Sequence, residues 1–85
     1  MREMNDAPLV CGCDVGSTTG KALLMRGGEV LGYSVIPCAV RPEITARQAL
    51  AAALADAGLE EEPAPSYIVA TGYGRVRIPF ASENV

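Results

Sequence analysis

The sequence predicts an α/β fold in which one helix covers a mixed sheet. Three short apolar runs lie in the first half of the chain, at 9–13, 21–26 and 29–36, and the third has the β-branched and aromatic residues typical of a strand. A stretch with apolar residues three and four positions apart follows them, which indicates a helix. Another apolar run, at 67–71, comes next. Because strand, helix and strand in succession form a right-handed crossover, this fourth strand is expected to be parallel within the sheet.

The N-terminal part of the sheet is predicted to be a β-hairpin. Gly27 and Gly28 separate the runs 21–26 and 29–36. Two adjacent glycines favour a two-residue hairpin turn, because both positions tolerate a positive φ. Pro37 is expected to end the third strand, since proline cannot donate to a strand ladder. The tail, residues 76–85, has only weak strand character and is interrupted by Pro79.

The helix has recognisable signals at both ends. Thr45 and Gln48 have the spacing of a capping box, which predicts a start near Thr45. Pro42 alternatively marks a first turn slightly earlier. Gly58 is a typical C-terminal stop. The apolar face is mostly alanine, so the helix is expected to lie close to the sheet; its members are Ala46, Ala49, Leu50, Ala53, Leu54 and Ala57.

Length and composition exclude several classes of protein. A chain of 85 residues forms one small domain of marginal stability. No apolar run approaches the ~20 residues that span a bilayer. Residues 1–8 lack the apolar core of a signal peptide and are expected to be a flexible leader, which favours a cytoplasmic location. The net charge of −3 argues against a nucleic-acid partner.

The segment 14–21, between the first two predicted strands, has the composition of a phosphate-binding turn. Glycine lets backbone N–H groups approach phosphate oxygens, and hydroxyls add further donors. Asp14 is the candidate catalytic residue, because its carboxylate is suited to position a hydrated Mg²⁺, and Lys21 either offsets phosphate charge or points to solvent. The alternative interpretation is an ordinary polar turn between strands. The candidate ligand-binding residues are Asp14, Gly16, Ser17, Thr18, Thr19 and Lys21.

This segment is not a Walker A loop. In that motif a glycine precedes the Gly-Lys pair by five residues, and Ser or Thr follows the lysine. Here those two positions hold Val15 and Ala22. A strand and a hairpin follow the segment, whereas a Walker A loop leads into a helix.

The cysteines have two interpretations. Cys11 and Cys13 alternate along a strand, so their side chains share one face. They are either a metal or redox pair or two small buried residues, and the second interpretation is favoured because free cysteine is commonly buried. Cys38 lies alone beyond the third strand. The odd number of cysteines, with no secretory signal, indicates reduced thiols, and no metal ligand set is predicted.

Two segments resemble a known family. Residues 11–22, CGCDVGSTTGKA, and 68–75, IVATGYGR, are similar to the N-terminal part of the CoA-substrate-specific enzyme activases. These are the 2-hydroxyacyl-CoA dehydratase activators and the ATPase subunits of benzoyl-CoA reductase. The first segment is shared with other actin-like ATPases, and the second narrows the resemblance. The resemblance covers nearly the whole chain from Leu9 onward.

The resemblance implies an actin-like, ribonuclease H-like ATPase fold, with residues 9–85 as an N-terminal portion that is apparently truncated. It implies ATP and Mg²⁺ as cofactors and a homodimer that holds a 4Fe–4S cluster. ATP hydrolysis would drive low-potential electron transfer to a CoA-thioester dehydratase or an aromatic-CoA reductase. The family's cluster cysteines do not match positions in this chain. The 85-residue piece alone is therefore expected to be inactive and to bind ATP weakly.

Other interpretations remain open at this stage. The same superfold includes small-molecule kinases of the sugar and pantothenate type. The chain could also be a nonenzymatic remnant or an interaction module. The residues Gly72, Tyr73, Gly74 and Arg75 form either a ligand-contacting loop at the end of a parallel strand or a solvated turn.

Overall fold

The computed structural model describes residues 7–61, 64–72 and 77–85. The predicted leader lies mostly outside these residues. Within them, the sheet has the strand order β3-β2-β1-β4-β5. The elements, in chain order, are β1 (Leu9–Val15), β2 (Thr19–Arg26), β3 (Glu29–Pro37), α1 (Pro42–Ala57), β4 (Tyr67–Gly72) and β5 (Glu83–Asn84).

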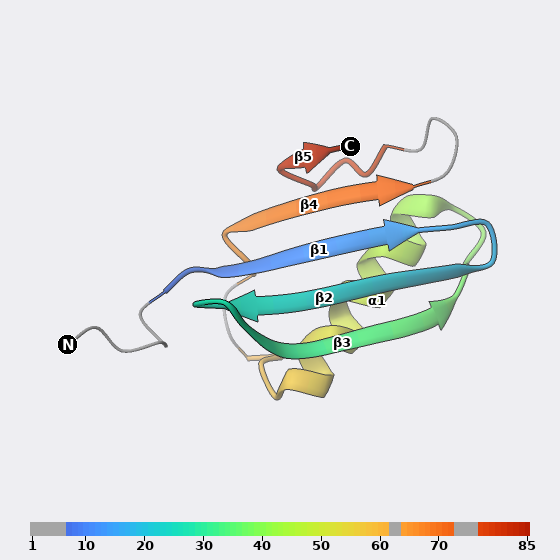
Figure 1. Ribbon diagram of the computed structural model, residues 1–85. Helices are drawn as coiled ribbons and strands as arrows, with labels where there is room; N and C mark the ends of the chain where they lie inside the picture. The colour runs from blue at the N-terminus through green and yellow to red at the C-terminus, as the bar shows by residue number, and fades with distance from the viewer. Residues whose placement is uncertain (1–6, 62–63, 73–76) are drawn as a thin grey trace.

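The sheet is mixed, as predicted. Strand β1 pairs antiparallel with β2, and β2 pairs antiparallel with β3. Strand β4 pairs in parallel with β1, and the short β5 in parallel with β4. The α/β fold class, with its N-terminal hairpin, crossover helix and parallel fourth strand, is therefore confirmed (Figure 1). The tail contributes one more edge strand than its weak pattern indicated.

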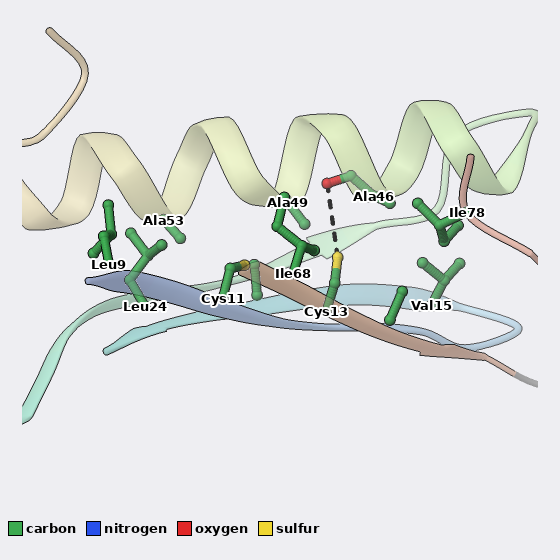
Figure 2. Close-up of a cluster of buried hydrophobic side chains, with 12 residues drawn as sticks. Leu9, Cys11, Cys13, Val15, Leu24, Ala46, Ala49, Ala53, Ile68 and Ile78 are labelled. Carbon is green, nitrogen blue, oxygen red and sulfur yellow. Dashed lines mark hydrogen bonds between the residues drawn. The ribbon is translucent and has the colours of Figure 1, made fainter. Parts of the chain in front are cut away.

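The core lies between α1 and one face of the sheet (Figure 2). Alternate residues of each strand point toward the helix, because successive side chains of a strand lie on opposite faces. Leu24 and three alanines of α1 are fully buried. Removal of this apolar surface from water is the main stabilising contribution to the fold. The core residues are Leu9, Cys11, Cys13, Val15, Ala22, Leu24, Ala46, Ala49, Ala53, Ile68, Ala70 and Ile78.

Two glycines let α1 approach the sheet closely. A Cβ added to Gly32 would lie 2.9 Å from the carbonyl oxygen of Ala53 and 2.9 Å from the amide nitrogen of Ala57. A Cβ on Gly20 would lie 2.4 Å from a methyl group of Thr45. The alanine face of the helix and the glycines of β2 and β3 are thus complementary, which confirms the predicted close approach.

The helix starts earlier than the capping box predicted. Arg41 is the N-cap residue, without a side-chain cap, and Pro42 opens the first turn. Thr45 lies inside the helix and is fully buried. Its hydroxyl accepts a hydrogen bond from the Ala39 N–H (2.7 Å) and donates one to the Arg41 carbonyl (3.3 Å). The prediction of a Thr45 cap was therefore wrong. The hydroxyl bonds to the segment that leads into the helix and does not cap the N-terminus of the helix. Proline is common at the first position of a helix, which explains the start at Pro42.

The helix stop and the glycine hairpin turn agree with the prediction. Gly58 ends α1 with φ 73°, in the left-handed region. Gly27 and Gly28 have φ values of 60° and 81°. A two-residue turn with positive φ at both positions has a backbone twist that matches the right-handed twist of the flanking strands.

The second face of the sheet carries a mixture of apolar and charged side chains. Tyr33, Val35 and Tyr67 on this face are 60%, 54% and 46% exposed. No element among the described residues covers them (Figure 1). In that same part of the chain, no helix is both long and apolar enough to cross a bilayer.

Candidate functional site

The candidate residues lie together at one edge of the sheet. The parallel strands β1 and β4 both end at this edge, and the turn that joins β1 to β2 lies there too (Figure 1). Ligands of α/β sheets commonly bind outside the carboxyl ends of parallel strands. The chain therefore places the 14–21 segment where such a fold binds ligands.

The turn itself is shorter than the sequence predicted. Strand β2 starts at Thr19, not at Lys21, and Val15 is already paired with Gly20. Only residues 16–18 connect the strands. Gly20 belongs to the helix-covered face of β2, where its lack of a side chain makes room for Thr45. Its position in the motif is thus explained by packing.

Two amide groups of the turn are available to a ligand. The Gly16 N–H donates to the Thr19 carbonyl (2.8 Å) and closes the turn. Among the described residues, no hydrogen bond is formed by the N–H of Ser17 or of Thr18. Both residues are exposed. Adjacent free N–H groups in a turn form an anion-binding concavity, so these two amides are suited to bind a phosphate.

The charged residues of the site are neighbours on the uncovered face. Asp14 and Lys21 are directly paired across β1 and β2. The Lys21 ammonium donates to the Thr19 hydroxyl (3.3 Å), which directs it toward the turn. Among the described residues, Asp14 and Lys21 form no ion pair with each other. The carboxylate thus remains available to a cation and the ammonium to an anion.

Hollows lie on both sides of this edge. A shallow hollow of about 450 Å³ on the uncovered face is lined by Asp14, Lys21 and Thr71, together with apolar residues that include Tyr33 and Val35. A smaller hollow of about 170 Å³ lies between the turn and the start of α1. The first contains Asp14, Lys21 and Thr71 in a mainly apolar lining, whereas the second is lined by Gly16 and Ser17 of the turn.

Cys11 and Cys13 lie in the core, as the interpretation of small buried residues predicted. The Cys13 thiol donates to the Ala46 carbonyl at 3.8 Å (Figure 2). Burial raises the pKa of Cys13 to about 11 and also raises the pKa of Cys11. Metal ligation requires the thiolate, which burial disfavours. Within the described ranges, no group of three or more Cys, Asp or Glu side chains is placed to hold a metal ion.

The buried thiols predict a loss of stability at alkaline pH. The ordinary pKa of 9.0 applies to Cys13 in the unfolded chain, whereas the folded value is about 11. The stabilisation is therefore fully present below pH 9 and is lost as pH rises toward 11, by about 1.4 kcal/mol per pH unit for one thiol. Urea denaturation at a series of pH values measures this slope. We expect Cys13→Ala to be less stable at neutral pH but to show a shallower decline; an identical decline would contradict the assignment.

Cys38 contacts the turn, which the sequence alone did not indicate. Its N–H donates to the Thr18 carbonyl (3.0 Å), and its thiol donates to the Gly16 carbonyl (3.2 Å). The only signal in the sequence was its position directly after β3, whose last residue, Pro37, pairs with Thr19. Cys38, directly after β3, thus supports the turn through these two hydrogen bonds.

We expect Cys38→Ala to loosen the turn. The substitution removes the thiol donor to Gly16 and leaves the backbone bond to Thr18 in place. The amide order parameters of Gly16 and Thr18 should fall, as measured by ¹⁵N relaxation. In Cys38→Ser, where a hydroxyl replaces the thiol donor, they should stay near the wild-type values. Equal order parameters in all three proteins would show that the thiol bond does not restrain the turn.

The second resembling segment is only partly described. Gly72 is the last residue of β4 and pairs with Val15 of β1, directly before the turn. This brings the two resembling segments together at one edge. Tyr73, Gly74 and Arg75 lie outside the described residues.

The fold matches that of the actin-like ATPase-type activators. The shared part comprises the antiparallel strands β1 to β3, the crossover helix and the parallel strand β4 beside β1. No family model matches the sequence. An uncharacterised protein of Methanocaldococcus jannaschii is 32% identical over 79 residues, which cover 91% of this chain and 30% of that protein.

Two solved dehydratase activators share this fold. Component A of (R)-2-hydroxyglutaryl-CoA dehydratase from Acidaminococcus fermentans matches with a TM-score of 0.75 and 25% identity over 93% of this chain. The activator of 2-hydroxyisocaproyl-CoA dehydratase from Clostridium difficile, solved with bound ADPNP, matches with a TM-score of 0.71 and 24% identity over 91% of this chain. The chain spans about 30% of the first of these structures and 28% of the second.

Proposed function

We propose that the chain is the nucleotide-binding N-terminal segment of an activator. The activator would couple ATP hydrolysis to low-potential electron transfer from a 4Fe–4S cluster to a 2-hydroxyacyl-CoA dehydratase or a benzoyl-CoA reductase type of enzyme. One observation carries the proposal: a turn with free amides, a carboxylate and a lysine lies at the ligand edge of a fold shared with two dehydratase activators. One of these was solved with bound ADPNP.

The residues of the site fit a nucleoside triphosphate with Mg²⁺. The Ser17 and Thr18 amides and the hydroxyls of the turn would donate to the β- and γ-phosphates. Lys21 would offset their negative charge. Asp14 would accept hydrogen bonds from the water shell of Mg²⁺, a cation that retains several waters when bound to proteins. The bound Mg²⁺ would neutralise charge that develops on the phosphate oxygens.

The cysteines of this chain do not fit the cluster. Cys11 and Cys13 are buried beneath α1, and Cys38 contacts the turn. In the proposed activator the cluster would be held by residues of a longer protein, between the two subunits of a homodimer. Because this chain spans about 30% of its structural relatives, that arrangement belongs to the proposed whole protein. Three free thiols are consistent with the cytoplasm as its location.

A titration with two nucleotides tests the binding step. A uniformly ¹⁵N-labelled chain is titrated with ATP and separately with AMP, each with excess Mg²⁺. The Ser17 and Thr18 amide signals should shift with ATP and much less with AMP, which lacks the β- and γ-phosphates. Because the isolated piece is expected to bind weakly, both nucleotides are titrated into the millimolar range. Equal shifts with ATP and AMP would contradict phosphate binding at the turn.

The electron-transfer part needs a separate test. Sequencing of the locus beyond codon 85 shows whether the reading frame continues. The proposal predicts a continuation that completes the ATPase fold and contains two cysteines able to join a cluster between subunits. A continuation without cysteines would remove the redox function and leave nucleotide binding.

A further inference from the structure

Three side chains form a row across the site edge, one from each of three adjacent strands. Asp14 of β1 is paired with Lys21 of β2 on one side and with Thr71 of β4 on the other. Paired residues on neighbouring strands lie about 5 Å apart and point to the same face. All three side chains line the hollow on the uncovered face and are exposed. Of the three, only Thr71 lies outside the 14–21 segment, so the phosphate-turn motif assigns it no role.

The Thr71 hydroxyl is able to accept further hydrogen bonds. Its hydroxyl donates to the Val85 carbonyl (3.3 Å). A hydroxyl has one donor hydrogen and two acceptor lone pairs. With the hydrogen directed to a carbonyl, the group presents acceptor capacity beside the Asp14 carboxylate, which is itself acceptor-only when ionised. Two neighbouring acceptors fit a cation whose bound waters donate outward.

We infer that Thr71 is a positioning residue for the hydrated Mg²⁺ of the bound nucleotide. Asp14 and Thr71 would accept hydrogen bonds from different waters of one ion, while Lys21, on the far side of Asp14, would face the phosphates. The strand order supports these separate roles. The two acceptors lie on β1 and β4, and the Lys21 ammonium lies on β2 next to the turn. This inference rests on the proposed nucleotide binding and adds a residue from the second resembling segment.

The test is the Mg²⁺ dependence of ATP binding in single and double variants. Mg²⁺ is titrated into the ¹⁵N-labelled chain with ATP present, and the Ser17 and Thr18 amides report binding. Thr71→Val keeps the β-branched shape and removes the hydroxyl. It should raise the Mg²⁺ concentration at half-maximal binding about tenfold, the lower end of what loss of an outer-shell partner costs. Thr71→Ser should restore most of the affinity.

Two further variants separate a role at the ion from a structural one. Asp14→Asn combined with Thr71→Val should weaken binding by less than the product of the single effects, because partners of one ion are energetically coupled. Ser66→Ala removes a hydroxyl that bonds to the Leu9 carbonyl at the opposite end of β4, and it should leave the Mg²⁺ dependence unchanged.

The outcomes distinguish this inference from the proposed function. If the wild-type chain binds ATP equally with and without Mg²⁺, the metal–nucleotide site is overturned, and the role of Thr71 with it. If wild-type binds and Asp14→Asn weakens binding while Thr71→Val does not, only the role of Thr71 is overturned. Fully independent effects of the two substitutions would also overturn it.

Discussion

Asp14→Asn should remove most of the Mg²⁺-dependent affinity for ATP. The substitution keeps the size of the side chain but removes its charge, and the exposed Asp14 forms no ion pair among the described residues that would compensate. Hydrogen bonds to charged groups contribute about 1.5–3 kcal/mol, which corresponds to a loss of roughly 10- to 100-fold in affinity. Calorimetric or NMR titration with ATP, with and without Mg²⁺, measures this loss.

A matched carboxylate controls for a general effect of charge. Asp56 on α1 accepts a hydrogen bond from the Tyr33 N–H (3.1 Å) and does not line either hollow beside the turn. Asp56→Asn makes the same chemical change and should leave ATP affinity unaltered. If both variants lost affinity equally, net charge and not a site at Asp14 would explain the binding.

Gly32→Ala should strongly destabilise the fold. The added methyl group would lie 2.9 Å from backbone atoms of Ala53 and Ala57, which cannot move without displacing α1. Overpacking of this kind typically costs about 1–3 kcal/mol. That is a large fraction of the stability of a small domain, so thermal unfolding should shift to a clearly lower temperature.

Another glycine of the sheet supplies the control. A Cβ added to Gly12 meets nothing within 4 Å. Gly12→Ala should therefore be neutral or stabilise by up to about 1 kcal/mol, because alanine restricts the unfolded chain. Circular dichroism melts of both variants measure the difference. Similar midpoints for the two would show that α1 does not depend on close contact with β3.

Local patterns in the sequence predicted most of the fold. The paired glycines at 27 and 28, the stop at Gly58 and the alanine face of α1 are features of short segments, and each appears in the structure. Thr45 shows where a local pattern failed. Its spacing to Gln48 fits a capping box, but its hydroxyl bonds to Ala39 and Arg41 because β3 delivers the chain to the helix at that point.

The site was predictable only in part, because part of it depends on contacts between distant segments. Asp14 and Lys21 lie in one motif, so their spacing indicated a shared role. Thr71 and Cys38 come from separate elements, and only the strand register and the path after β3 bring them to the turn. Sequence alone also assigned Gly20 to the turn, whereas its contact with Thr45 shows that it serves helix packing.

The most direct test of nucleotide binding locates the metal of the bound nucleotide. Mn²⁺ replaces Mg²⁺ at sites made of carboxylates and waters, and its unpaired electrons broaden the signals of nearby amides. Addition of Mn²⁺ with ATP to the ¹⁵N-labelled chain should broaden the amides of Asp14, Ser17, Thr18 and Thr71 first, and broadening should be much weaker with Mn²⁺ alone. Broadening that spares these residues, or that is the same with and without ATP, would contradict a metal–nucleotide site at this turn.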